Sequence, residues 1–126
     1  MGMILSIAAG GAVGALGRHW IAGGIQSLVG ASFPFGTLAV NVIGCCVIGA
    51  LVVLMAQVWS PSQEMRAFLT VGMLGALTTF STFSMEVVLM TERGDYFFAG
   101  FYVIASVILS VGAVFASMAA MRWFLS

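Results

Sequence analysis

The chain has 126 residues, of which 62% are hydrophobic and only 6% are charged. A water-soluble domain carries about 25% charged residues, so the four basic and four acidic side chains present here cannot cover a solvent-facing surface. The formal net charge of +0 leaves no surplus that would favour nucleic acid or a large anionic substrate. Composition therefore predicts an integral membrane protein and excludes soluble enzymes and nucleic-acid-binding proteins.

Four long apolar blocks follow one another with short polar connections. A spanning helix needs about 20 apolar residues, whereas a membrane barrel would need roughly 10-residue segments that alternate apolar and polar. The unbroken blocks predict an all-α membrane protein with helices over residues 3–28, 35–59, 63–91 and 95–124. Because every connection is short, we expect a single four-helix transmembrane domain over residues 1–126.

The arginines are balanced between the two ends of this arrangement. Arg66 and Arg122 lie on the side of the termini, whereas Arg93 lies on the other side and Arg18 is nearer to it. Short loops rich in Lys and Arg stay cytoplasmic, and an even balance gives no such bias. The balance favours dual topology, for which an antiparallel homodimer is the simplest closed assembly. The alternative is that one loop arginine fixes a single orientation.

Pairs of small residues four apart mark faces where helices can approach closely in lipid. The pairs are Gly10 with Gly14, Gly72 with Ala76, and Gly112 with Ala116.

The adjacent Cys45 and Cys46 point in different directions on a helix, so they predict no disulfide. We interpret both as small packing residues. With one histidine, His19, the chain offers no plausible metal set of Cys and His ligands. His19 is interpreted as an interfacial side chain, with a proton-relay role as the alternative.

Polar side chains inside the second and fourth apolar blocks indicate either helix contacts or a water-filled path, because they are costly in hydrocarbon. Asn41 lies near the centre of the second block, and an interhelical hydrogen bond is as good an explanation for it as a pore. Tyr102, Ser106 and Ser110 recur every four residues and form one row of hydroxyls on the fourth helix. Serines also bond to their own preceding turn, so a pathway and a purely local role both remain open.

The third block contains the densest polar run, Thr78 to Ser84, with Glu86 just beyond it. Threonines are stiff and hydroxyls compete for backbone groups, so the run predicts a helix broken near its centre. Lipid forbids the resulting unpaired backbone groups unless they line a cavity or hold an ion. Glu86 is the one carboxylate within a span, and we place it away from any anion path, in a structural pairing.

Three motifs together resemble the small bacterial fluoride channels of the Fluc or CrcB family. They are the Gly-Gly-x-x-Gly-Ala-x-x-Arg pattern of Gly10 to Arg18, the Gly-Thr-Leu-Ala-Val-Asn stretch of Gly36 to Asn41, and the Thr-Thr-Phe-Ser-Thr-Phe-Ser run with Glu86. One position departs from the family pattern, because Ala76 stands where a second glycine precedes this run.

The resemblance implies a dual-topology antiparallel homodimer in the bacterial inner membrane, with two pores that pass fluoride passively out of the cell and so confer fluoride resistance. It implies a vestibule role for Arg18, although an interfacial anchor is the alternative. It also implies a structural sodium ion on the twofold axis, held by the backbone carbonyls of Gly75 and Thr78. The pore-lining set that the family pattern implies is Asn41, Phe80, Phe83, Ser81, Thr82, Tyr102, Ser106 and Ser110.

Amide and hydroxyl donors in this set can replace the water around a small anion, and phenyl edges carry the positive end of the ring quadrupole. Two other classes compete with a channel. A small dual-topology multidrug or cation exporter needs a carboxylate in its first helix, and residues 3–28 contain none. A non-transporting accessory subunit would not need the aligned hydroxyls. No nucleophile, base and orienting group converge, so we expect no enzyme.

Overall fold

The computed structural model describes all residues 1–126; its only regular elements are helices, which confirms the all-α part of the predicted fold class. Its three uninterrupted long helices are α1 (Gly2–Val29), α2 (Phe35–Gln57) and α6 (Tyr96–Leu125). The third segment is divided into α3 (Gln63–Arg66), the π-helix η1 (Ala67–Leu74), α4 (Gly75–Leu77) and α5 (Ser81–Glu92). These helix ends differ from the expected ones by no more than two residues.

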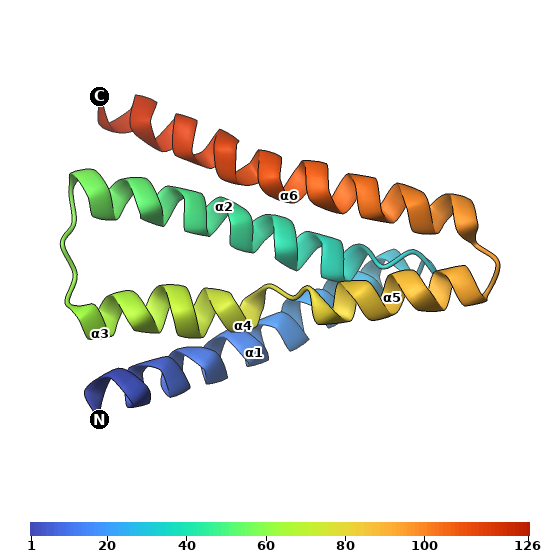
Figure 1. Ribbon diagram of the computed structural model, residues 1–126, viewed down its shortest axis with the longest axis horizontal. Helices are drawn as coiled ribbons and strands as arrows, with labels where there is room; N and C mark the ends of the chain where they lie inside the picture. The colour runs from blue at the N-terminus through green and yellow to red at the C-terminus, as the bar shows by residue number, and fades with distance from the viewer.

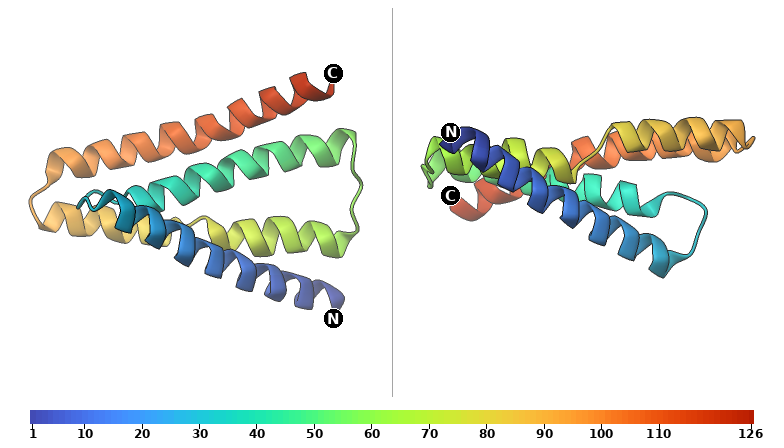
Figure 2. Two further views of the ribbon diagram at one scale, coloured as in Figure 1. Left: turned by 180° about the vertical axis from the view of Figure 1, so that it is seen from behind. Right: turned by 90° about the horizontal axis from the view of Figure 1, so that it is seen from below.

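The segments run alongside one another, with both termini and the α2–α3 connection at one end (Figure 1). The α5–α6 turn lies at the opposite end. α1 packs against α2, η1 and α4, whereas α5 packs against α6 and makes no contact with α1. Figure 2 shows the consequence: α1 and the start of α2 diverge from α5 towards the end of the molecule that holds the α5–α6 turn.

Three segments are long and apolar enough to cross a membrane: Phe35–Gln57, Gln63–Glu92 and Tyr96–Leu125. The sequence predicted four. α1 has 28 residues, which at about 1.5 Å per residue is sufficient length, but seven of these residues are glycine and contribute little hydropathy. The structure thus gives three apolar spans and a fourth, glycine-rich helix packed beside them.

The loop between α1 and α2 is held by one side chain. Gly30 ends α1 in the left-handed conformation at φ 66°, and its N–H donates to the Gln26 carbonyl. The Gln26 Nε2 donates to the carbonyl oxygens of Ala31 and Phe33, at 2.8 and 3.0 Å. Its Oε1 accepts from the Gly36 N–H at 3.0 Å. Gln26 thereby provides partners for backbone groups that the end of one helix and the start of the next leave free.

Glycines let α1 and the third segment meet backbone to backbone. A Cβ on Gly10 would meet the Phe68 carbonyl oxygen and the Met73 nitrogen, and one on Gly14 would meet the Met73 carbonyl. On the opposite face of the contact, a Cβ on Gly72 would meet the Ile7 carbonyl oxygen. The first two predicted small-residue pairs therefore include true packing positions.

The third pair does not pack within the chain. Nothing lies within 4 Å of a Cβ built on Gly112, and Ala116 is exposed on the same helix. The expectation of a close helix contact at this pair is therefore wrong for the isolated chain, because α2 meets α6 on another face. The close glycine contact between α2 and α6 is at Gly49, where a Cβ would meet the Ser117 hydroxyl of α6.

The predicted break in the third segment is confirmed. Thr78 follows α4 with an extended backbone, φ −85° and ψ 154°, and helix resumes at Ser81. A Cβ on Gly44 of α2 would meet the Thr78 methyl group, so α2 makes room for the irregular backbone. The π-helical geometry of η1 was not predicted, because the wider hydrogen-bonding pattern has no signal in residue type.

Candidate functional site

The broken segment is tied to α2 by the amide of Asn41. Its Nδ2 donates to the Thr79 carbonyl at 3.1 Å, and its Oδ1 accepts from the Thr79 N–H at 2.8 Å. The interhelical hydrogen bond that the sequence left open for Asn41 is therefore present. An amide nitrogen has two N–H groups, so one remains free while the other holds the break.

The remaining backbone groups at the break differ in whether they have a hydrogen-bond partner. The Thr79 hydroxyl accepts from the Thr82 N–H at 3.2 Å, which caps the start of α5. The N–H of Thr79 bonds to Asn41 rather than continuing the helix, and no N–H donates to the carbonyl oxygens of Gly75 and Thr78. These two carbonyls therefore keep their full capacity to accept hydrogen bonds or to bind a cation.

A groove of about 290 Å³ opens beside the break, between α2, α5 and α6. We call it the central groove. Its lining is Asn41, Cys45, Thr78, Thr79, Phe80, Phe83, Ser106, Val107, Ser110 and Val111.

Two phenylalanines form one wall of the central groove, with ring centroids 5.5 Å apart and planes inclined by 51°. They differ in exposure: the Phe83 residue is 8% exposed and packs edge-on against Tyr102, whereas Phe80 is 77% exposed. The opposite wall carries the hydroxyls of Ser106 and Ser110 from α6. The Ser106 Oγ is buried and has no hydrogen-bond partner within the chain.

The structure brings five of the eight expected pore residues to this groove, namely Asn41, Phe80, Phe83, Ser106 and Ser110. Tyr102 continues the α6 row but is fully buried and bonds elsewhere. Ser81 is exposed beside Thr79, and Thr82 lines a different cavity. Ser106 and Ser110 of the α6 row therefore lie on the groove side, as predicted. The hydroxyls of Ser81 and Thr82, at the start of α5, point in different directions and do not line the groove.

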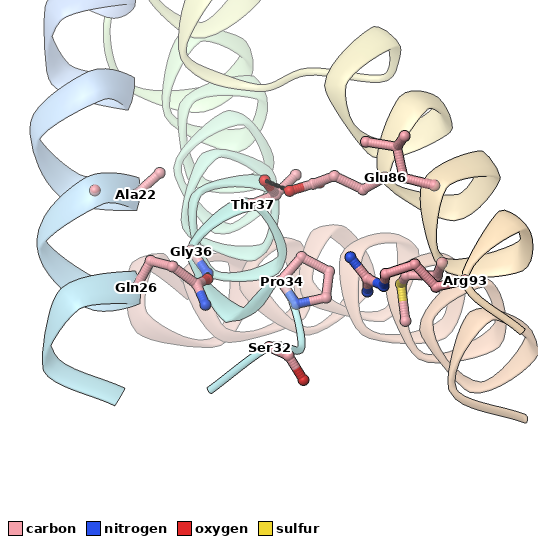
Figure 3. A pocket seen from close by; sticks show the side chains of 11 residues that line it. Ala22, Gln26, Ser32, Pro34, Gly36, Thr37, Glu86 and Arg93 are labelled. Atoms are coloured by element: carbon pink, nitrogen blue, oxygen red, sulfur yellow. Dashed lines mark hydrogen bonds between the residues drawn. The ribbon is translucent and has the colours of Figure 1, made fainter. Parts of the chain in front are cut away.

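A second, polar cavity lies where α1 diverges from α5 (Figure 3). We call it the Glu86 cavity; its lining includes Gln26, Ser32, Thr37, Glu86 and Arg93. The Glu86 carboxylate accepts hydrogen bonds from the Thr37 hydroxyl at 3.1 Å and the Tyr102 hydroxyl at 3.0 Å. Glu86 is therefore paired, as expected, although it also borders open space.

Arg93 closes the far side of the Glu86 cavity and points into it (Figure 3). Its Nε lies 3.5 Å from the Asp95 Oδ2, an exposed ion pair in the turn before α6. A surface pair of this kind contributes little to stability, on the order of 0–1 kcal/mol. Arg93 therefore lies beside the negative Asp95 and also lines the cavity.

Arg18 and His19 line a third cavity of about 310 Å³ between α1, α2 and α5. We call it the Arg18 cavity. Thr37, Thr79 and Thr82 add hydroxyl groups to its lining, and Thr79 places it beside the break. Arg18 and the break therefore share one cavity, which an interfacial anchor alone would not require.

Sequence reasoning missed two features of the site. Cys45 was interpreted as a packing residue, yet it lines the central groove; its position four residues after Asn41 placed it on the same face. The Thr37–Glu86–Tyr102 cluster joins α2, α5 and α6, and no local pattern connects residues so far apart in sequence.

Comparisons with known proteins agree with the motifs. Residues 5–118 match the family model described as "CrcB-like protein, Camphor Resistance (CrcB)". A protein of Rhodospirillum centenum named fluoride-specific ion channel FluC is 48% identical over 122 residues, which cover 97% of each chain. A protein of the same name from Rhizobium leguminosarum is 47% identical over 94% of each chain. One from Geobacter sulfurreducens is 47% identical over 97% of this chain and 98% of its own. The chain belongs to the CrcB family.

Proposed function

We propose that the protein is a fluoride-selective channel that lets fluoride leave the cell passively down its gradient. The relatives that carry this name match nearly the whole chain. The observation that carries the proposal is the central groove, whose lining combines the rings of Phe80 and Phe83 with the polar side chains of Asn41, Ser106 and Ser110. A channel performs no chemical step, so the protein is not an enzyme.

The groove has the chemistry that a small, strongly hydrated anion requires. A path must replace lost water with donors, and the free N–H of Asn41 and the hydroxyls of Ser106 and Ser110 supply them. The edges of Phe80 and Phe83 contact an anion weakly through the ring quadrupole. Weak sites in series permit both entry and exit.

The proposed path extends beyond the groove. Tyr102 lies one turn before Ser106 in the same row, and Ser81 and Thr82 follow Phe80 at the start of α5. Arg18 supplies a positive charge in the cavity behind the break, where it raises the local anion concentration. We assign these four residues to the ends of the path and the five groove residues to its centre.

A homodimer completes the path. Phe80 is 77% exposed although it stands at the centre of the segment, so in one chain its ring has no covering partner. A second copy in antiparallel orientation would cover it and repeat the groove, giving two pores. The balanced arginines support dual topology, and α1 would be the fourth span in the bacterial inner membrane. The exposed Gly112 and Ala116 offer a close contact to the second copy.

The unpaired carbonyls of Gly75 and Thr78 fit a structural sodium ion. Hard cations prefer oxygen ligands, and two chains would supply four such oxygens at a twofold axis. The ion would satisfy backbone groups that lipid cannot, and so hold the break open. Its role is structural, because an anion path uses donors rather than a cation site.

Family membership does not support the alternative of a small multidrug or cation exporter. The structure adds a physical reason: α1 contains no carboxylate, and the embedded Glu86 is occupied by two hydroxyl donors.

The test is fluoride efflux from liposomes that contain the purified protein, followed with a fluoride electrode under a potassium gradient with valinomycin. We expect fast fluoride flux that needs the ionophore, with chloride flux at background. Phe80→Ile should abolish the flux while the protein keeps its elution volume and dimer, because isoleucine keeps an apolar side chain against the second copy but removes the ring edge.

Phe97→Ile is the matched control for this variant. Phe97 is also 77% exposed and packs edge-on against its neighbour Phe98, with ring centroids 5.4 Å apart, yet it lies outside the groove. Its flux should equal that of the unaltered protein. Undiminished flux through the Phe80→Ile variant would contradict the pore assignment, and absence of fluoride flux in the well-folded unaltered dimer would contradict the channel itself.

A further inference from the structure

A groove of about 240 Å³ opens near the α2–α3 connection, at the end of the molecule that holds both termini (Figure 1). We call it the Arg66 groove. α2 packs mainly against α6, and η1 packs mainly against α1, so space remains between α2 and η1. The groove is lined by Val52, Met55, Ala56, Arg66 and Thr70.

Arg66 is the one charged residue that lines this groove, and its guanidinium has no acidic partner. The ion pair of the chain lies at the opposite end, in the turn before α6. The Arg66 Nη1 lies 3.5 Å from the Met55 sulfur, which is a weak acceptor. Glu64 lies two residues before Arg66 and points to another side of the helix, since a Cβ on Gly2 of α1 would lie 3.6 Å from its Cγ. The positive charge at the groove is therefore left uncompensated within the chain.

The place of Arg66 in its segment puts this charge at the level of lipid headgroups. The segment Gln63–Glu92 has 30 residues, which at about 1.5 Å per residue span roughly the thickness of a bilayer with both headgroup layers. Arg66 is near the start of that segment and so lies outside the hydrocarbon. Val52 lies more than one turn before α2 ends at Gln57, so the apolar part of the groove extends inward from the charge.

We propose that the Arg66 groove binds an anionic phospholipid, with the phosphodiester on the Arg66 guanidinium and one acyl chain along Val52 and Ala56. A guanidinium matches two phosphate oxygens at once, and basic pockets between membrane helices bind anionic headgroups. Inorganic phosphate would gain the charge contact alone. A lipid also covers the apolar wall, where Val52 is 47% exposed, so the groove selects the lipid. The site is independent of the proposed fluoride path.

The first test titrates the purified protein in detergent with phosphatidylglycerol and counts bound lipids by native mass spectrometry. Arg66→Gln should bind phosphatidylglycerol about fivefold more weakly than the unaltered protein. Arg122→Gln is the matched control, because Arg122 is also exposed at the end with the termini but does not line the groove. Its affinity should be unchanged, and phosphatidylcholine with the same acyl chains should not distinguish the three proteins. Unchanged affinity in Arg66→Gln, or an equal loss in Arg122→Gln, would overturn the proposal.

The second test separates the groove from the charge. Val52→Trp fills the groove and keeps Arg66, so it should weaken phosphatidylglycerol binding, whereas Ile43→Trp, at an exposed position of α2 outside the groove, should not. Inorganic phosphate should displace the lipid no better than chloride at equal ionic strength. Displacement by phosphate alone would instead identify a site for free anions and overturn the lipid assignment.

The elution volume of each variant tests the other possible occupant, a second copy of the chain. Arg66→Gln and Val52→Trp should elute as the unaltered protein does. If either variant changed its oligomeric state while Arg122→Gln did not, the groove would be a contact between copies, and the lipid assignment would be wrong. None of these measurements uses fluoride flux, so failure of the channel assignment and failure of the lipid site are distinguishable.

Discussion

The two halves of the third segment share one sequence block but are held by different forces. The first half, η1 with α4, packs against α1 through glycines at which backbone atoms of the two helices touch. The second half, α5, has no contact with α1 and is joined to its neighbours by side chains. Those side chains are Phe83 against Tyr102 and Glu86 between two hydroxyls.

This difference explains where the cavities are. Backbone contact at glycine leaves no room for water, so the first half forms a dry anchor. Side-chain contact holds helices further apart, and polar groups line the remaining space, as in the central groove and the Glu86 cavity (Figure 3). The break lets one continuous segment be both an anchor and a wall of the proposed path.

The largest expected effect comes from disturbing the anchor. Gly10→Leu should prevent accumulation of folded protein, because even a Cβ would meet the Phe68 carbonyl oxygen and the Met73 nitrogen, which cannot move without separating the helices. Gly11→Leu is the control, since a Cβ there meets nothing within 4 Å. The two variants are compared by their yield of monodisperse protein and by their melting temperature in detergent. A Gly10→Leu protein as stable as Gly11→Leu would show that the backbone contact between α1 and η1 is not needed for stability.

A smaller effect is expected at the joint between the halves. Asn41→Ala removes both hydrogen bonds to the Thr79 backbone. Each buried group left unpaired costs about 1–3 kcal/mol, so melting temperature and fluoride flux should fall together. Asn41→Asp keeps an acceptor for the Thr79 N–H and loses the donor. Its melting temperature should therefore lie between those of the unaltered protein and the Asn41→Ala variant. Full fluoride flux in a destabilised Asn41→Ala protein would show that Asn41 stabilises the break but does not contribute to the anion path.

The smallest effect is expected within the side-chain half. Tyr102→Phe removes the buried hydroxyl that donates to Glu86 at 3.0 Å and should cost about 1–3 kcal/mol of unfolding free energy. Tyr96→Phe, at a residue that is 70% exposed, should leave stability unchanged. Denaturant-induced unfolding in detergent compares them. Equal stability of the two variants would mean that the Glu86 cluster contributes nothing to holding α5 on α6.

Local sequence predicted the elements well. The apolar blocks predicted the outer ends of the four segments to within two residues, and the Thr-rich run predicted a break that lies at Thr78. The row of Ser106 and Ser110 was also predictable, because residues four apart share a helix face. The single-domain organisation and the roles of the pore residues stay predictions.

Features that depend on distant segments were not predictable. Glu86 meets Thr37 and Tyr102 across three helices, which no spacing within one helix encodes. The Gly112 pair looked like the Gly10 pair in sequence, yet it packs against nothing within the chain. The same motif therefore has different consequences, depending on which face another helix covers.

The sequence by itself determined that the protein is a helical membrane protein with a broken third segment, because hydropathy, helix spacing and hydroxyl competition act over a few turns. Its three motifs carried the resemblance to the CrcB family. Only the tertiary structure decided that Asn41 clamps the break, that Glu86 joins Thr37 and Tyr102, and that Ser106 is left without a partner. These depend on how helices are rotated and separated, which is set by the sum of all their contacts rather than by any one segment.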